Sequence, residues 1–330
     1  MKLRSRFFAL GSALTGIALF IYVIKETGPE AIWSHIGSLG FGFLLILATS
    51  STRYLSRSFS WLRCVMPEER GVGFWALWRA RLAGEAIGEL TIGPLVGEPM
   101  KVLALGKRLS VSSGMSSLVV EDIAYTVSSC LMVMAGAVAL LASFGLHESL
   151  RTAIFAALAV VLLISLAVFI VIGRRMNLGS SLAVFLSRAL MRDAAKRRQI
   201  EDKIEHLRRM ENYIFDFYTY RRTDFILVAL CEMAFHLAGV LEIYTTLRLI
   251  GVDLFLPTAF MLEAINRAMN IVFIFVPVLV GVDEAGTGLM TNTLGFGVTT
   301  GVALAIVRKI RMFFWIGVGL VFMAVARKGE

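Results

Sequence analysis

The sequence RLAGEAIGELTIGPLVGEPMK, at residues 81–101, places Glu85, Glu89, Glu98 and Lys101 between long apolar segments. At the depth of a lipid bilayer a charged side chain costs about 2.5 to 3.5 kcal/mol on insertion scales, so such residues usually face a cavity or a transport pathway. Four glycines and a central proline in the same stretch disfavour an unbroken helix. The stretch therefore predicts an interrupted membrane element that lines a polar site.

The composition is that of an integral membrane protein. Of the 330 residues, 57% are hydrophobic and 17% are charged, against about 25% charged residues in ordinary soluble domains. Apolar runs long enough to cross roughly 30 Å of hydrocarbon lie at about 7–24, 40–62, 115–144, 152–172, 224–250 and 299–326. The first run resembles a secretory signal but has no good cleavage site, so we expect a retained anchor. These runs predict an all-α polytopic membrane protein with about six spanning helices.

The net charge of +9 predicts topology rather than binding to nucleic acid, because basic residues collect in cytoplasmic loops of membrane proteins. The basic segments are the N-terminus, the region from Arg53 to Arg81, the pair Lys107 and Arg108, the segment from Arg174 to Arg222, and Arg327 with Lys328. Connections poor in lysine and arginine, at 26–39, 145–150 and 251–256, belong outside. We therefore expect a multi-pass protein of the bacterial inner (plasma) membrane with both termini in the cytoplasm.

Two apolar stretches, at about 74–105 and 257–297, are interrupted by proline and glycine. A single crossing by the second stretch would place the basic C-terminal end outside, against the positive-inside rule. Two re-entrant hairpins, entering from opposite faces, satisfy the rule, and so do two full crossings in each stretch, which would make eight or more crossings in all. Non-helical backbone at such depth is tolerated only where protein or an aqueous cavity covers it.

The two interrupted stretches resemble each other. Each has an arginine before an apolar helix, then a proline, a glycine and a glutamate: Arg81, Pro94, Gly97 and Glu98 in the first, and Arg267, Pro277, Gly281 and Glu284 in the second. Such a pattern, entering from opposite faces, is typical of an inverted repeat, in which broken helices mark the transport site. The alternative is that proline and glycine are simply common in membrane helices.

Between the two halves lies a mixed-charge segment with apolar residues at helical intervals. We predict a first membrane half at 1–175, an amphipathic basic connector at 176–223 on the cytoplasmic face, and a second membrane half at 224–330. The basic residues of the connector either bind anionic headgroups or are simply solvated.

Several charged residues are candidates for a substrate-binding or translocation site. Glu85 and Glu89 share one helix face, and Glu98 and Lys101 are spaced to form an ion pair. The helix at 299–326 would place three cations near mid-membrane, where they cannot remain unpaired; alternatively it ends near Arg308 and they are interfacial. They could neutralise Glu85, Glu98 or Glu284, or bind a lipid phosphate. The candidates are Glu85, Glu89, Pro94, Gly97, Glu98, Lys101, Arg267, Asn270, Pro277, Gly281, Glu284, Arg308 and Arg311.

No catalytic motif is evident. The four histidines are scattered, and the sequence has no HExxH, nucleophile elbow or P-loop. Glu232 and His236 are four residues apart and could form a hydrogen-bonded pair or a proton relay. The three cysteines have no paired spacing. We therefore expect neither an enzyme nor a bound metal or cofactor.

The stretches GEAIGELTIGPLVGEPMK and VPVLVGVDEAG resemble the two signatures of the lysylphosphatidylglycerol synthase transmembrane-region family, also called flippase-like membrane proteins. The resemblance covers nearly the whole chain. It matches Glu85, Pro94, Gly97, Glu98 and Lys101 to the first signature, and Pro277, Gly281, Glu284 and Gly286 to the second. Gly88 and Val96 depart from an asparagine and a glycine that are usual there, so polar substrate contacts at these two positions are not carried over.

The resemblance implies a lipid flippase or transporter that moves a polar-headgroup lipid (a phospholipid, aminoacyl-lipid, glycolipid or hopanoid) between leaflets. Because no soluble synthase domain follows residue 330, we expect a single-domain member without synthase activity. Two alternatives stay open: a membrane-embedded lipid-modifying transferase, and a non-catalytic membrane partner of a lipid-synthesis enzyme. The expected partner is the membrane lipid; self-association and a synthesis enzyme are further options.

Overall fold

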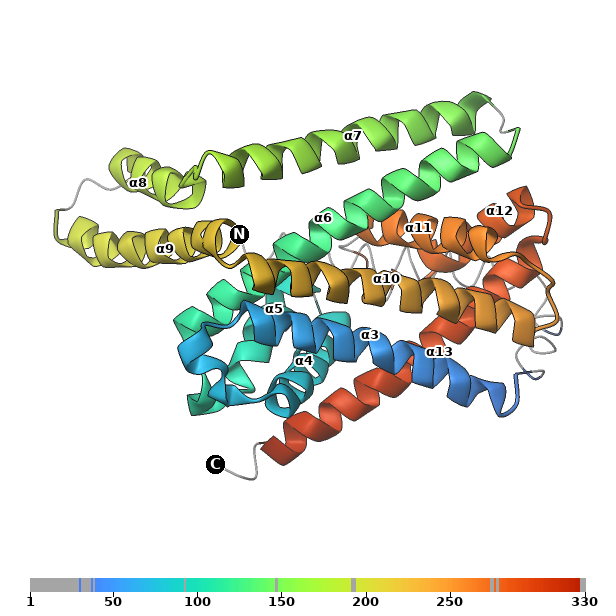
Figure 1. The fold of residues 1–330 in the computed structure, drawn as a ribbon, viewed down its shortest axis with the longest axis horizontal. Helices are drawn as coiled ribbons and strands as arrows, with labels where there is room; N and C mark the ends of the chain where they lie inside the picture. Colours follow the sequence, from blue (N-terminus) through green and yellow to red (C-terminus); the bar gives the residue numbers. More distant parts are fainter. Residues whose placement is uncertain are drawn as a thin grey trace.

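The computed structural model describes residue 30, residue 37 and the ranges 39–91, 93–145, 148–190, 194–273, 276 and 279–326. Within these residues the chain is helical, with no strand (Figure 1). The all-α prediction is therefore confirmed. The first apolar run and the C-terminal basic pair lie outside the described residues.

Five long helices follow the apolar runs: α3 (Gly42–Cys64), α6 (Val111–Ser143), α7 (Glu148–Gly173), α10 (Arg222–Leu249) and α13 (Val298–Ala326). Among the described residues, three helical segments are long and apolar enough to cross a membrane: Val111–Ser143, Ile154–Gly173 and Arg222–Leu249. Helices α3 and α13 are of similar length but carry three cationic side chains each. A polytopic helical membrane fold accounts for the three apolar segments. It also accounts for α3 and α13 if their cations pair with carboxylates inside the bundle.

The interrupted stretches form pairs of short helices: α4 (Phe74–Glu89) with α5 (Pro94–Leu103), and α11 (Leu256–Val272) with α12 (Val282–Thr293). The first break occurs at Gly93, whose φ of 58° and ψ of −135° suit glycine alone. The second contains Leu279, with φ of 48°, and Gly281, with φ of 80°. At 1.5 Å per residue even α11 extends only about 26 Å, less than the roughly 30 Å of a hydrocarbon core.

The elements of the two halves pack reciprocally (Figure 1). Helices α3 and α10 run side by side, with Gly42 of one beside Leu249 of the other. Helix α4 packs against α13, and α11 packs against α6. Close approach at both contacts depends on glycine, because a Cβ on Gly319 would lie 2.2 Å from the carbonyl oxygen of Leu82 and one on Gly136 would lie 2.1 Å from Cβ of Ala264. Each half therefore holds the interrupted element of the other.

The segment between the halves forms α8 (Leu178–Leu190) and α9 (Ala194–Tyr220). Helix α9 is fastened to the long helices, because Tyr213 donates to the carbonyl of Cys64 and Tyr218 donates to the carbonyl of Val120 at 2.8 Å. Burial raises the pKa of Tyr213 to about 12, so its hydroxyl stays a neutral donor near neutral pH.

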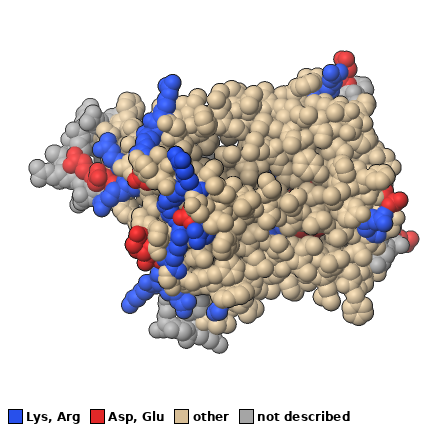
Figure 2. Space-filling view, in the orientation of Figure 1, with Lys and Arg blue, Asp and Glu red and all other residues tan. Residues whose placement is uncertain are grey.

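Lysine and arginine gather at the end of the molecule that carries α8 and α9, and few charged side chains show along the middle (Figure 2). We call this the basic end; it includes the 3-10 helices η1 (Pro67–Val72) and η2 (Gly106–Arg108). The prediction of a basic loop from Arg53 to Arg81 was wrong. Arg53 and Arg57 lie within α3, and Arg81 is fully buried in α4, because carboxylates from other helices pair with them.

Two apolar clusters close the bundle lengthwise. At the basic end, one cluster contains Trp61, Val65, Val72, Leu77, Leu105, Leu109 and Leu118. Toward the opposite end, a larger cluster contains Leu39, Ile46, Leu247, Ile250, Leu254, Ala259, Leu294 and Leu304. We call them the basic-end cluster and the opposite-end cluster. The charges that line the central cavity lie between them.

The packing predicts that Gly319→Ala destabilises the protein while Gly317→Ala does not. A Cβ at Gly319 meets the backbone of Leu82, whereas nothing lies within 4 Å of a Cβ at Gly317. Overpacking of this kind costs about 1 to 3 kcal/mol. Thermal unfolding of the purified variants in detergent measures the difference, and equal midpoints would contradict the α4 and α13 contact.

Candidate functional site

A cavity of about 510 Å³ lies in the middle of the bundle, lined by α3, α4, α5, α6, α10, α11, α12 and α13 together with both helix breaks. Nine of the candidate residues line it: Glu85, Glu89, Gly97, Glu98, Lys101, Arg267, Asn270, Arg308 and Arg311. Glu284 and Gly281 lie behind this lining, at the start of α12. Pro94 is the first residue of α5, and Pro277 lies outside the described residues.

The cavity also contains residues that were not among the candidates. These are Arg53, Tyr54, Arg57, Arg81, Tyr125, Phe235, Asn266, Asp283 and Lys309. Arg53 and Arg57 were assigned to a loop, although they lie four residues apart inside the apolar run at 40–62. The reasoning applied to the cations of the last helix, that buried cations need partners, would have identified them as well.

Glu85 and Glu98 approach the same cation across the first break. Nζ of Lys101 lies 2.7 Å from Oε1 of Glu98 and 3.5 Å from Oε1 of Glu85. Nη1 of Arg81 adds a 3.1 Å contact to the same oxygen of Glu85. The predicted Glu98 and Lys101 pair is therefore present. Lys101 is 1% exposed, so these carboxylates replace the water that would otherwise surround its ammonium group.

Gly88 allows α4 and α5 to approach at this point. A Cβ there would lie 3.2 Å from the carbonyl oxygen of Gly93 and 3.3 Å from Cα of Gly97. The departure from asparagine at position 88 thus coincides with tight backbone contact, while Gly88 still lines the cavity.

A second group of charges joins α3, α4 and α6. Nε of Arg57 lies 2.6 Å from Oε1 of Glu121, and its Nη2 lies 3.0 Å from Oδ1 of Asp122. Nη2 of Arg81 lies 2.9 Å from the other oxygen of Glu121. Glu121 and Arg81 have no exposed side-chain surface, so each neutralises the other in a low-dielectric environment where a lone charge would be very costly.

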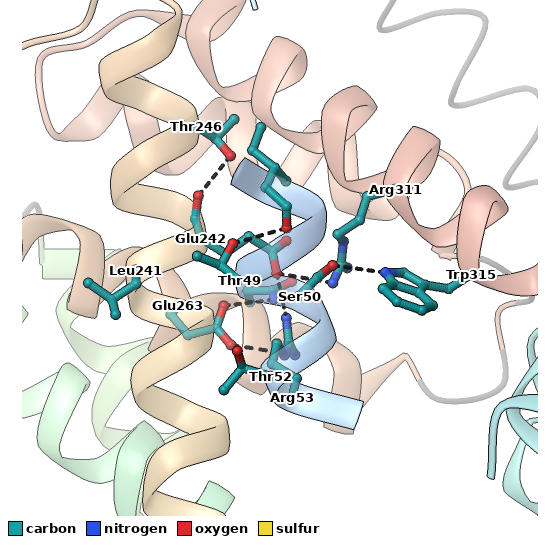
Figure 3. A network of polar contacts seen from close by, with 12 residues as sticks. Thr49, Ser50, Thr52, Arg53, Leu241, Glu242, Thr246, Glu263, Arg311 and Trp315 are labelled. Carbon is teal, nitrogen blue, oxygen red and sulfur yellow. Dashed lines mark hydrogen bonds and ion pairs between the residues drawn. The ribbon is translucent and has the colours of Figure 1, made fainter. Parts of the chain in front are cut away.

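In a third group of charges, Arg53 of α3 contacts carboxylates of α10 and α11 (Figure 3). Its Nη1 lies 3.2 Å from Oε2 of Glu242, and its Nη2 lies 3.9 Å from Oε1 of Glu263. Nη1 of Arg311 reaches the same oxygen of Glu242 at 3.1 Å, and Nη2 of Arg267 lies 2.5 Å from Oε1 of Glu263. One carboxylate thus joins α3, α10 and α13, as Figure 3 shows.

The other two cations of α13 hold α12. Nη2 of Arg308 lies 2.6 Å from Oδ1 of Asp283, and Lys309 pairs with Glu284. Oε2 of Glu284 also accepts a 2.8 Å hydrogen bond from the backbone N–H of Gly281. The prediction that these cations neutralise Glu85, Glu98 or Glu284 is confirmed for Glu284, which pairs with Lys309. Arg308 and Arg311 instead pair with Asp283 and Glu242. The alternative of a helix that ends near Arg308 was wrong, since α13 continues to Ala326.

Two aromatic rings bring three guanidinium groups together. The Cζ atoms of Arg53, Arg267 and Arg57 lie 4.6, 4.9 and 5.9 Å from the ring centre of Phe235. Cζ of Arg57 is also 4.1 Å from the ring centre of Tyr125, whose hydroxyl oxygen accepts a 3.1 Å hydrogen bond from Arg267. Ring faces attract cations, so Phe235 and Tyr125 lower the cost of the crowded positive charge.

The predicted pairing of Glu232 with His236 was wrong. Ser60 donates to Oε1 of Glu232 at 3.1 Å, and Nε2 of His236 lies 3.0 Å from the hydroxyl of Ser128. Each residue therefore fastens α10 to a different neighbour, α3 or α6.

Glu89 differs from the other carboxylates of the cavity. Its side chain is exposed at the last turn of α4, and no ion pair to it occurs among the described residues. Among all the residues that the structure describes, no group of three histidine, cysteine or acidic residues could hold a metal ion. The site is thus a nearly charge-balanced set of carboxylates and cations, with the carboxylate of Glu89 exposed at its edge.

These features define an all-helical membrane protein with a charged internal cavity formed at two helix breaks. The chain matches the family described as the lysylphosphatidylglycerol synthase TM region over residues 8–320, and it belongs to that family. No significant match to a curated protein or to a solved structure is found.

The buried pairs predict that substitutions of two arginines differ greatly in their effect on stability. Arg267→Met leaves Glu263, which is 1% exposed, without its 2.5 Å partner, and breaking a buried pair costs about 3 to 5 kcal/mol. Arg248→Met removes an ion pair to Asp253, which is 93% exposed, and should cost less than about 1 kcal/mol. Chemical denaturation in detergent compares the two, and the double variant Arg267→Met with Glu263→Gln should regain part of the loss. Equal effects of Arg267→Met and Arg248→Met would contradict a buried network.

Proposed function

We propose that this protein moves the headgroup of a polar lipid between the two leaflets of the membrane. The observation that carries this proposal is the cavity of about 510 Å³, lined by charged residues from both interrupted stretches, in the middle of a helical membrane protein. A lipid headgroup cannot cross hydrocarbon cheaply, because its charges and hydrogen-bonding groups would lose their partners there. The cavity offers replacement partners at the depth where water is absent.

Shared carboxylates suit such a function. Glu242 contacts both Arg53 and Arg311, and Glu121 contacts both Arg57 and Arg81. A headgroup that binds one arginine would leave the carboxylate with the second, so no buried charge becomes fully unpaired. Guanidinium groups also present planar pairs of donors that match phosphate or carboxylate oxygens.

The reciprocal packing of the halves supports an inverted repeat in which α3 to α6 correspond to α10 to α13. In this proposal the basic end faces the cytoplasm of a bacterial cell, in keeping with the positive-inside rule. The two halves would rock against one another to expose the site to each leaflet in turn. The membrane potential and protonation of cavity carboxylates are the candidate energy sources.

Leaflet exchange of fluorescent phospholipids in proteoliposomes tests the proposal. Glu98→Gln removes the 2.7 Å pair to Lys101 and Arg308→Ala removes the 2.6 Å pair to Asp283. A hydrogen bond to a charged group contributes about 1.5 to 3 kcal/mol. Each change should therefore slow exchange about tenfold or more, because the lost pair stabilises the protein at the barrier to transport. The exposed Arg248→Ala is the matched control and should exchange lipid at the wild-type rate.

Equal exchange in the wild type, in both cavity variants and in empty liposomes would contradict transport. Mass spectrometry of the recovered lipid tests the alternative function. A chemically altered headgroup would indicate a lipid-modifying transferase instead.

A further inference from the structure

The position of the cavity opening follows from the exposure of its lining. Of the described residues that line the cavity, four have exposed side chains: Glu89, Thr126, Ile271 and Phe273. Glu89 is the last residue of α4, and Ile271 and Phe273 lie at the end of α11. The opening is therefore at the helix breaks rather than at either end of the bundle.

Along the helix axes, buried apolar residues lie on both sides of the cavity. On α3, Ile46 belongs to the opposite-end cluster and Trp61 to the basic-end cluster, while Arg53 and Arg57 face the cavity between them. Ile46 and Trp61 are both fully buried. The same order holds on α6, where Leu118 and Leu140 lie on either side of Tyr125 and both are nearly fully buried. On α3 and α6, apolar clusters therefore separate the cavity from both ends of the bundle.

Thr126 lies on α6 where the two breaks approach each other. Helix α11 follows α6 from Gly136, which contacts Ala264, down toward Phe273 at the break. Helix α5 follows α6 from Gly114, which contacts Val102, up toward Gly93 at the other break. Thr126 is about midway along α6, so the three elements frame one lateral opening.

Apart from Glu89 and Thr126, the exposed residues around this opening are apolar. Leu95 is 73% exposed, Val272 66% and Leu90 50%. An opening into water would not be surrounded by large exposed aliphatic side chains in this way, since burial of such surface is favourable. Its position between two apolar end clusters places it at the depth of the acyl chains.

We infer that the cavity opens sideways into the bilayer between the ends of α4 and α11, and that the acyl chain of the transported lipid occupies this opening. The inference rests on the proposed function, because a lipid whose headgroup lies in the cavity must lead its tail out through the only exposed part of the described lining. Thr126 and Ile271 form its edge. The cavity volume then limits the size of the headgroup. The tail stays in the membrane, so the protein does not select for its length.

Bulky side chains at the edge test this route. In the exchange assay, Thr126→Trp and Ile271→Trp should slow transport about tenfold or more, because the added ring fills the opening of a tightly packed structure. Leu162→Trp on α7, where the leucine is 58% exposed, is the matched control and should leave the rate unchanged. Wild-type rates in both edge variants would overturn the lateral route while leaving lipid transport intact.

A second measurement separates the route from transport itself. In a variant with Cys64, Cys130 and Cys231 replaced by alanine, single cysteines are introduced at Thr126, Leu162 and Asp253. A charged thiol reagent, present on both sides of the membrane, should label Thr126→Cys as slowly as Leu162→Cys and much more slowly than Asp253→Cys, because residue 253 is exposed at the bundle end. Labelling of Thr126→Cys at the rate of Asp253→Cys would show a water-facing opening and overturn the inference, whether or not the wild type transports lipid.

Discussion

The structure depends on one constraint: a charge within the membrane must be neutralised by another charge. Removing an ion from water costs several kcal/mol even after relaxation, and only close pairing offsets this. The pair formed by Arg81 and Glu121, with no exposed side-chain surface, illustrates the constraint. Where the partners come from different helices, as Arg81 and Glu121 do, the pair also specifies how two helices pack. The charges that seem least suited to a membrane therefore determine the arrangement of the bundle.

The same pairs explain how a rigid bundle can hold a binding site. Ion pairs that share a carboxylate, as Arg53 and Arg311 share Glu242, allow one partner to be exchanged without exposing an unpaired charge. Phe235 and Tyr125 hold neighbouring guanidinium groups close together despite their repulsion. A polar headgroup can enter such a network by substitution. The apolar clusters at the two ends keep water from competing for the same partners, and electrostatic contacts are stronger where water is excluded.

Much of the fold was predictable because it depends on local patterns. Apolar runs of sufficient length predicted α3, α6, α7, α10 and α13, and glycine with proline predicted the two breaks. The pair of Glu98 with Lys101 is three residues apart on one helix, so its spacing was enough. Arg53 and Arg57 were missed because an arginine within an apolar run is equally consistent with a buried cation and with the end of a membrane helix. The pairing of Glu232 with His236 failed because helical spacing also allows two side chains to turn toward different neighbours.

The sequence by itself determined that this is a helical membrane protein with two broken elements and an unusual set of deep charges, since hydrophobicity, glycine, proline and charge act through chain neighbours. Only the tertiary structure decided which charges of different helices meet. Arg308 pairs with Asp283 rather than with a carboxylate of the first half, and Arg53 reaches Glu242, which is 189 positions away. Coulomb attraction depends on distance in space, and that distance is set by how α4 packs on α13 and α11 on α6.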